Sequence, residues 1–487
     1  MLALGVLALP LGACDLDRVL AVRDPEQVSP SELENAQSVP GLFNGALRSF
    51  VIAYSGAGDD AYLSTSGLIA DELHTGDTFT TRQATDQREQ QIPALGNTSD
   101  AAYARLQLAR GVARRAAFAA QTFGVGSGGN AATLPATLAT LRALEGFTYV
   151  TLAEGFCGNI PFSVVPESGP IDPLDATLFR PGITTAAAFD SAIVRMNSGL
   201  EAQPTNNLAR VGLGRAQLNN ARYAAAATAV AAVPTTYVFR LEHSANTGAQ
   251  NNPIWALQSN RRYGIANDEG GDQRPDQRGD AAATPAQRAG FETDEGEGLA
   301  FRAYMDPRVT WAFAGAAFLG GVNLHVDRRY VDQNSDVPLA SGVEARLIEA
   351  EALLQADNNA AFLTKLNNLR DSASVLIPIL FPAIPDAVKA TFPQTLPRLT
   401  DPGTRAARVD MLFRERALWM FLTGHRLGDL RRLVRQYGRP QETVFPTGSF
   451  AYVRAGAVYG NDVAFPIPFT EVNNTAFTPS LCNVDQA

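Results

Sequence analysis

The stretch Arg408–Arg435, RVDMLFRERALWMFLTGHRLGDLRRLVR, decides the fold more than any other part of the sequence. Its first half repeats apolar residues at helical spacing, which predicts a helix with one buried stripe. The stripe consists of Met411, Leu412, Leu418, Trp419 and Leu422. Gly424 predicts the end of this helix, because glycine adopts the left-handed conformation without a Cβ clash. A second helix is expected directly afterwards, with Leu427, Leu430 and Leu433 facing inward.

Three charged residues fall in this bend, namely Glu415, Arg426 and Asp429. Charges at a packed helix corner normally require partners, because an unpaired buried charge costs several kcal/mol. We therefore interpret them as structural ion pairs that fix the corner. The alternative is a catalytic carboxylate, and it is disfavoured because neither a nucleophile nor a histidine pair accompanies the acids.

The same stretch resembles the signature of the SusD/RagB family of outer-membrane nutrient-binding lipoproteins, which reads roughly E-R-R-x-E-L-x-F-E-G-x-R-x-x-D-L. The matching residues are Glu415, Arg416, Gly424, Arg426, Asp429 and Leu430. Trp419 and Thr423 stand where the family usually has glutamates. We therefore expect part of the family's charge network to be missing here.

Further segments along the chain are similar to the same family. Leu141–Pro161 resembles its helix followed by an aromatic and glycine turn, and Glu344–Glu351 and Leu366–Ala373 are similar to a second signature. AFPIPFTE, residues 464–471, is close to its closing F-P-I-P-x-x-E motif. The prolines Pro466 and Pro468 predict an extended tail that lies across the body of the protein.

The composition sets the class of protein. The chain has 487 residues, of which 46% are hydrophobic and 18% charged, and this favours closely packed helices over disorder. Its net charge of −9 argues against a nucleic-acid partner. After the first dozen residues, no apolar run reaches the length of about 20 that a membrane-spanning helix needs.

The first residues, MLALGVLALPLGAC, are apolar and end in Leu-Gly-Ala-Cys. This resembles a bacterial lipobox, which predicts a lipoprotein signal peptide over residues 1–13 and lipidation of Cys14. The alternative is an ordinary hydrophobic start with a chance cysteine. The basic residues that normally precede such a segment are absent, so we expect the true start to lie upstream of Met1.

Lipidation of Cys14 would leave Cys157 and Cys482 as a pair. Two thiols in an oxidising compartment can form one disulfide, which would join the C-terminal tail to the middle of the chain. Two separate buried thiols are the alternative.

An internal repeat predicts the helical architecture. LARVGLGRAQLNNARYAAAATA, from Leu208, aligns without a gap with EARLIEAEALLQADNNAAFLTK, from Glu344. Each copy reads as a helix, a short polar turn and an alanine-rich helix. Such hairpins resemble tetratricopeptide repeats, although these two copies are far apart in the sequence.

Residues 235–340 lack sustained helical periodicity and are rich in aromatic, glycine and acidic residues. Sugar rings stack on aromatic side chains while amide and charged groups bind their hydroxyls. We therefore expect a ligand platform of residues from this insertion, and the candidates are Trp255, Asn260, Arg261, Tyr263 and Trp311. The alternative is that both tryptophans are core anchors.

Metal binding is poorly supported, because the four histidines lie far apart and in no ligand spacing. The acidic segments Asp268–Asp272 and Asp294–Glu297 do not follow the order of an EF-hand calcium loop, which favours solvated loops. We expect neither a metal nor a cofactor. The sequence also lacks the G-x-S-x-G and P-loop motifs.

The prediction is a mainly α-helical protein in which tetratricopeptide-like hairpins form a curved scaffold over about 30–234 and 341–487. The loop-rich insertion, about 235–340, would face the ligand. The family resemblance, over residues 14–487, implies a non-enzymatic lipoprotein anchored in the outer membrane and facing the cell surface. It would bind an oligosaccharide or peptide and deliver it to a SusC-like TonB-dependent transporter. A periplasmic helical-repeat scaffold or chaperone that binds peptides is the alternative, and a secreted helical glycosidase is a further one.

Overall fold

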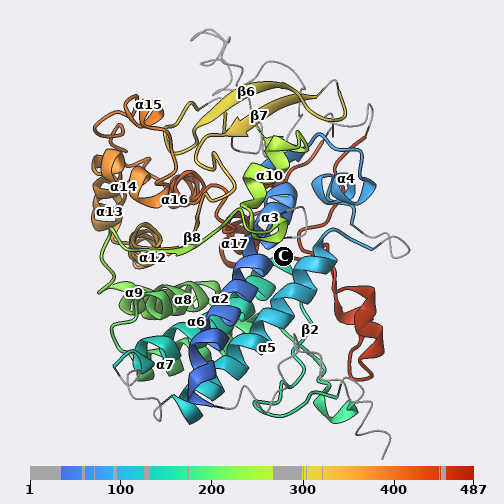
Figure 1. Ribbon diagram of the computed structural model, residues 1–487. Helices are drawn as coiled ribbons and strands as arrows, with labels where there is room; N and C mark the ends of the chain where they lie inside the picture. Colours follow the sequence, from blue (N-terminus) through green and yellow to red (C-terminus); the bar gives the residue numbers. More distant parts are fainter. Residues whose placement is uncertain are drawn as a thin grey trace, which may run out of the picture.

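The computed structural model (Figure 1) describes residues 35–57, 61–70, 72–90, 96–124, 132–172, 175–266, 299, 301–302, 304–320, 322–448, 450 and 457–487. It is mainly helical, as the sequence predicts. Cys14, the expected signal peptide and the two acidic segments lie outside these residues. None of the described helices is both long enough and apolar enough to cross a membrane.

Most helices of the N-terminal half pack in series in the lower part of Figure 1, while α3 and α4 lie higher in that view. α2 packs on α5, α5 on α6, α6 on α7 and α7 on α8. The helices of this half are α2 (Val39–Ser55), α3 (Tyr62–Ile69), α4 (Thr80–Asp86), α5 (Ser99–Phe123), α6 (Leu134–Gly155) and α7 (Thr185–Ala202). Pro135 stands in the first turn of α6, where a proline needs no hydrogen-bond acceptor.

The two copies of the repeat form equivalent hairpins. The first is α8 (Asn207–Asn219) with α9 (Tyr223–Val230), and the second is α12 (Gly342–Gln355) with α13 (Asn359–Asp371). Their turns match in backbone conformation, because Ala221 and Asp357 both have positive φ, at 56° and 55°. α12 packs against α8 and α9, so the copies lie side by side although 136 positions separate them.

The bend predicted at Gly424 is present. α16 (Arg405–Trp419) ends five residues before it, so Leu422, which the spacing predicts on the helix stripe, lies in the bend with φ +49°. α17 (Arg426–Tyr437) begins just after Gly424, which has φ +76°. A Cβ on Gly424 would lie 2.5 Å from the hydroxyl oxygen of Tyr54. Gly424 is therefore required both by its backbone conformation and by the close approach of α2.

The proline-rich residues 374–404 are partly helical. They contain most of α14 (Ala373–Leu380) and all of α15 (Asp386–Lys389). Leu376, Ile377 and Leu380 are buried, and this burial stabilises α14 even though Pro378 lies within it.

The strands among the described residues form four two-stranded antiparallel sheets. The pairs are β1 (Leu73–Thr75) with β5 (Tyr263–Ile265), β2 (Ile160–Pro161) with β3 (Gly182–Ile183), β4 (Val238–Leu241) with β8 (Val337–Ser341), and β6 (Trp311–Ala316) with β7 (Asn323–Asp327). The β6–β7 hairpin and α10 (Pro253–Ser259) lie in the upper part of Figure 1. The region predicted to be loop-rich therefore contains strands, and β4–β8 joins its two ends to each other.

Short 3₁₀ helices complete the described elements. They are η2 (Ala36–Ser38), η3 (Ala176–Leu178), η4 (Gly248–Gln250), η5 (Gln441–Thr443), η6 (Phe469–Asn473) and η7 (Pro479–Leu481). One continuous hydrophobic cluster includes residues from α2 through Phe465, so the helices and the insertion share a core.

The C-terminal tail is extended and lies across the body, as its prolines predict. Phe465 donates from its N–H to the carbonyl of Gly155 and accepts from the N–H of Cys157, both at 2.8 Å. The disulfide between Cys157 and Cys482 is present, which confirms the predicted pairing. The tail is thus attached to the end of α6 by hydrogen bonds and by a covalent bond.

Candidate functional site

Glu415 joins three parts of the chain through ion pairs. Its carboxylate lies 2.7 Å from Nη1 of Arg308 in the insertion and 2.5 Å from Nη1 of Arg370 on α13. Arg308 is also paired with Asp306, at 2.7 Å. Burial disfavours the charged form of Arg308, but Glu415 and Asp306 outweigh it and raise the pKa of its guanidinium. Glu415 is therefore a structural residue that fixes the insertion to the helices.

Asp429 is likewise a paired structural acid. It accepts from Nε and Nη2 of Arg416 at 2.8 and 2.9 Å, and from Nη2 of Arg432 at 2.9 Å. Arg432 is also paired with Glu351, at 2.5 Å. Burial acts against ionisation, but Arg416 and Arg432 together lower the pKa of Asp429 far below its ordinary value. The predicted roles of Glu415 and Asp429 are confirmed, and an ion pair of Arg426, which is buried at the start of α17, stays a prediction.

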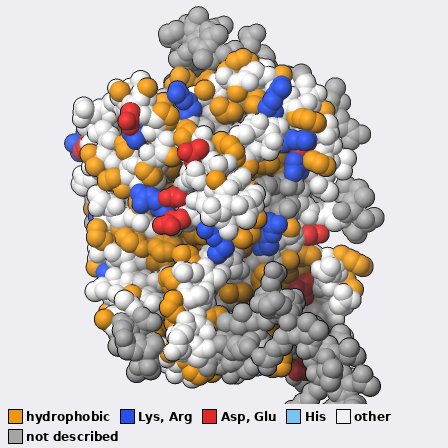
Figure 2. Space-filling view, viewed as in Figure 1, with side chains coloured by type: hydrophobic (Ala, Val, Ile, Leu, Met, Phe, Trp, Pro, Cys, Tyr) orange, Lys and Arg blue, Asp and Glu red, His pale blue; other side chains and the backbone are white. Residues whose placement is uncertain are grey.

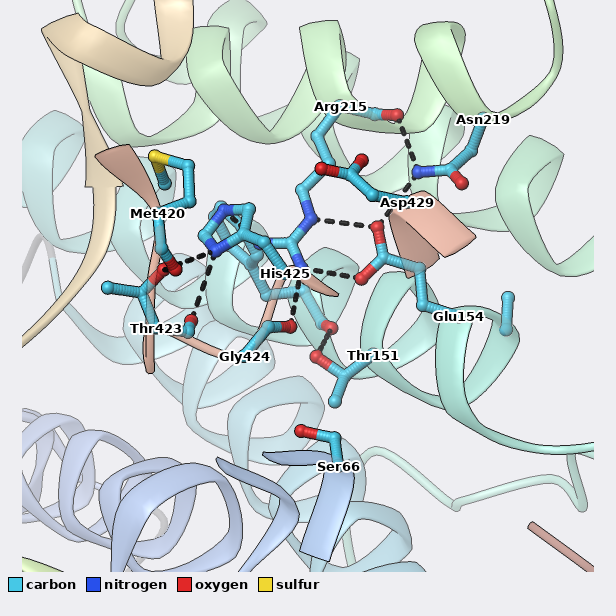
Figure 3. Close-up of polar contacts among 12 residues, drawn as sticks. Ser66, Thr151, Glu154, Arg215, Asn219, Met420, Thr423, Gly424, His425 and Asp429 are labelled. Atoms are coloured by element: carbon cyan, nitrogen blue, oxygen red, sulfur yellow. Dashed lines mark hydrogen bonds and ion pairs between the residues drawn. The ribbon is translucent and has the colours of Figure 1, made fainter. Parts of the chain in front are cut away.

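A second buried network surrounds Gly424 (Figure 3). Arg215 donates from Nε to Glu154 at 2.8 Å, and its Nη1 lies 2.8 Å from Nε2 of His425. The same nitrogen of His425 lies 3.3 Å from Glu344. Burial raises the pKa of Glu344, but His425 and then Arg215 act more strongly in the opposite direction and lower it overall. These contacts connect α6, α8, α12 and the corner in the core.

The two residues that replace the family's glutamates are uncharged, and both contact charged or polar groups of the corner. At one of the two positions without the family's glutamate, the indole ring of Trp419 packs against Arg308, with the guanidinium carbon 5.2 Å from the ring centroid. At the other, the hydroxyl of Thr423 lies 2.9 Å from Nδ1 of His425. The corner is thus densely paired, and the two substituted residues take part in it.

The predicted ligand platform is only partly assembled. Tyr263 is fully buried in β5, with 0% of its surface exposed, so its ring cannot stack on a ligand, and this part of the prediction is wrong. Pairing of β5 with β1 places that ring in the core. Trp311 is half-buried, its indole N–H donates to the carbonyl of Arg302, and its ring packs on His325.

The other predicted residues lie at the surface. Trp255 is half-buried on α10, while Asn260 and Arg261, just beyond the end of α10, are exposed. Arg261 donates from Nε to the carbonyl of Ala316, at 2.7 Å, and accepts from the N–H of Phe318, at 2.8 Å. The loop after α10 is therefore bonded to the turn of the β6–β7 hairpin.

That junction carries two phenylalanines that the sequence prediction missed. Phe79 and Phe318 are each 52% exposed, although they come from segments 239 positions apart. The guanidinium carbon of Arg262 lies 3.7 Å from the ring centroid of Phe318 and 5.4 Å from that of Phe79. Arg82 lies 4.6 Å from the centroid of Phe79. No sequence signal marks this set, because the four residues meet only in the folded chain.

Buried Asp77 organises the set by forming ion pairs with both Arg82 and Arg262. We name Phe79, Arg82, Arg261, Arg262 and Phe318 the aromatic–arginine surface. It lies where α4, the loop after α10 and the β6–β7 hairpin meet, at the top of Figure 1. The corresponding end of the molecule in Figure 2 shows hydrophobic and basic side chains interspersed. Exposed rings beside fixed guanidinium groups can stack on a ligand and donate hydrogen bonds to it.

Among the described residues, no group of three or more histidine, cysteine, aspartate or glutamate side chains is arranged to hold a metal ion.

Asn252, which the sequence places beside Trp255, is buried and has a structural role. Its side chain accepts from the N–H of Trp255 and donates to the carbonyl of Ser335.

No protein-family model matches the sequence, and no curated protein is similar to it. Solved structures do match. A SusD-like carbohydrate binding protein from Bacteroides vulgatus has a TM-score of 0.60 and 14% identity, and the match covers 91% of this chain and 97% of that one. A SusD superfamily protein from Bacteroides thetaiotaomicron has a TM-score of 0.59 and 12% identity, and the match covers 91% of this chain and 99% of that one. A laminarin binding SusD-like protein has a TM-score of 0.57 and 13% identity, and the match covers 91% of this chain and 98% of that one. The chain has the fold of the SusD-like proteins.

Proposed function

We propose that this protein is a non-enzymatic carbohydrate-binding protein whose ligand contacts the aromatic–arginine surface. The observation that carries the proposal is the SusD-like fold over nine-tenths of the chain, together with this exposed surface. Two of the solved structures with this fold are described as a carbohydrate binding protein and a laminarin binding protein. A fold by itself does not determine function, so the surface has to supply the chemistry.

The geometry of the surface suits a sugar chain. The C–H faces of a sugar ring stack on aromatic rings, and Phe79 and Phe318 present such rings from two different segments. Arg261 and Arg262, with exposed Asn260 beside them, supply donors for hydroxyl oxygens. Because Asp77 fixes Arg82 and Arg262, little side-chain entropy is lost when a ligand binds.

The absence of catalysis is also part of the proposal. A glycosidase needs two opposed carboxylates beside its substrate. In this chain the buried acids Glu154, Glu351, Glu415 and Asp429 are each bonded to arginine. We infer that these carboxylates stabilise the fold and that the bound ligand leaves unchanged.

For the cellular role, we propose that lipid on Cys14 anchors the protein in the outer membrane, facing the cell surface. There it delivers oligosaccharide to a SusC-like TonB-dependent transporter by opening and closing over the barrel. The lipobox-like Leu-Gly-Ala-Cys and the SusD-like fold support this proposal. The helical scaffold would contact the transporter and the insertion would face the ligand.

The test is calorimetric titration of the purified chain with a panel of oligosaccharides that includes laminarin, combined with chromatography of the recovered glycan. We expect binding without degradation products. Phe79→Ala and Phe318→Ala should each weaken binding about three- to tenfold, the equivalent of one stacking contact. Phe469→Ala removes a phenylalanine that is 71% exposed on η6 and should leave binding unchanged. Equal effects of all three substitutions, or degraded glycan, would refute the proposal.

The alternative role as a periplasmic scaffold or chaperone for peptides makes a different prediction. A transporter-associated protein should co-purify with a large outer-membrane barrel protein after mild detergent extraction, whereas a periplasmic chaperone is released without detergent. Binding of extended peptides with no response to the Phe79 and Phe318 substitutions would favour the chaperone.

A further inference from the structure

A cavity of about 670 Å³ shares no lining residue with the aromatic–arginine surface. It is open to solvent and is lined by the start of α7, the turn between α8 and α9, the second half of α17 and the C-terminal segment. Among the residues that line it are Thr185, Asn219, Arg431, Arg435 and Asn483. This volume is typical of sites for small organic molecules.

The described side chains that line the cavity carry net positive charge. Two arginines of α17, Arg431 and Arg435, line it one helical turn apart, and the described lining contains no aspartate or glutamate. Arg431 donates to the main-chain carbonyls of Ala153, Glu154 and Phe156, at 2.8–3.1 Å. Within the described part of the chain, neither arginine forms an ion pair with an acidic side chain. Burial and the charge of Arg435 lower the pKa of Arg431 to about 9, so its positive charge is poorly compensated.

Two further features favour an anion. Thr184, Thr185 and Ala186 line the cavity at the N-terminus of the 18-residue helix α7, where free N–H groups and the helix dipole attract negative charge. In addition, buried polar atoms on three lining residues have no hydrogen-bond partner among the described residues, namely Arg431 Nε, Arg435 Nη2 and Asn219 Oδ1. The first two are donors, and the third is an acceptor.

We propose that this cavity binds a small organic anion, a carboxylate or phosphate carried on a hydroxylated body such as a sugar acid or sugar phosphate. Arg435 and the N-terminus of α7 bind the anionic group. The site is separate from the aromatic–arginine surface and does not depend on glycan binding there. The bound anion supplies the negative charge that Arg431 and Arg435 do not receive from described acidic side chains.

The test is calorimetric titration of the full chain with glucuronate, glucose 6-phosphate, inorganic phosphate and neutral glucose. Glucuronate or glucose 6-phosphate should bind at least tenfold more tightly than glucose, and the comparison of the two identifies which anionic group the site prefers. Arg435→Met should weaken that binding about 10- to 100-fold, the loss expected for a charge-assisted hydrogen bond. The thermal unfolding temperature of this variant should not fall, because Arg435 has no hydrogen-bond or ion-pair partner among the described residues.

Arg439→Met is the matched control, because it removes the same charge from just beyond α17, where Arg439 is paired with Asp410. It should not change anion binding. Phe318→Ala should not change it either, and this separates the inference from the proposed function. The inference is overturned if no anion binds more tightly than glucose. It is also overturned if Arg439→Met weakens binding as much as Arg435→Met.

Discussion

Arg215 on α8 and Glu154 on α6 form a buried ion pair with two hydrogen bonds, Nε to Oε1 at 2.8 Å and Nη2 to Oε2 at 2.5 Å (Figure 3). Both side chains are only 3% exposed. The pair joins the N-terminal helices to the first repeat, and Arg215 also contacts the corner through Gly424 and His425. Three regions distant in sequence therefore depend on one guanidinium group.

Replacement of this arginine should strongly destabilise the protein. Arg215→Met leaves the Glu154 carboxylate buried without its partner, which costs about 3–5 kcal/mol of the free energy of unfolding. Urea denaturation measures the loss. Arg222→Met is the control, because Arg222 forms an ion pair with Asp190 in which both side chains are about half exposed, and such a pair contributes about 0–1 kcal/mol. Similar losses of stability for the two variants would contradict the structural role of the buried Arg215–Glu154 pair.

Gly424 should tolerate alanine much less well than Gly438. Both have positive φ, at +76° and +64°, but a Cβ at 424 would meet Tyr54, whereas a Cβ at 438 has no atom within 4 Å. Gly438→Ala should therefore cost about 1 kcal/mol for the backbone alone. Gly424→Ala should cost at least about 1 kcal/mol more because α2 must move away. The free energies of unfolding of the two variants test this, and equal values would show that Tyr54 adapts freely.

The disulfide should stabilise the protein by restricting the unfolded chain. It closes a loop with a sequence separation of 325 residues, for which the chain-entropy model gives about 6 kcal/mol. The double variant Cys157→Ser with Cys482→Ser should lose up to that amount in urea denaturation. Reductant should destabilise the wild type and leave the double variant unchanged. A wild type that does not respond to reductant, once its thiols are shown to be free, would refute this contribution.

In the turn of the first repeat, a substitution should increase the free energy of unfolding instead of lowering it. Ala221 has φ +56°, a conformation that costs an alanine about 1 kcal/mol relative to glycine. Ala221→Gly should therefore stabilise the protein by up to about 1 kcal/mol. Ala225→Gly places glycine within α9 instead and should destabilise by about 0.5–1 kcal/mol. Thermal unfolding of both variants should give shifts of opposite sign, and a shared sign would contradict the strain at Ala221.

Asp462 should make stability fall as the pH rises. Burial raises its pKa to about 6, although the N–H of Gln90 donates to its carboxyl group. The folded state thus binds the proton more tightly than the unfolded state. This contribution is present below about pH 4 and is lost as the pH rises through about 6, a change of at most about 3 kcal/mol. Asp462→Asn keeps an acceptor for Gln90 without the titration. The variant should gain stability over the wild type between pH 4 and 6, and a difference independent of pH would contradict this.

The sequence by itself determined the helical class, the bend near Gly424 and the repeated hairpins, and it offered the disulfide as one of two alternatives. These features depend on local signals: helical periodicity, the left-handed conformation that glycine permits, self-similarity and a pair of cysteines. The SusD/RagB motifs also predicted the fold that the solved structures share.

Only the tertiary structure decided which residues form the two candidate sites. Tyr263 is buried because β5 pairs with β1, a contact between positions about 190 apart that no local pattern shows. Phe79 and Phe318 become neighbours through that same packing. Arg431 and Arg435 stand one turn apart on α17. They line a cavity only because α7 and the disulfide-bound tail lie beside them. Local propensity reports what one segment prefers, whereas burial and charge compensation depend on what packs against it.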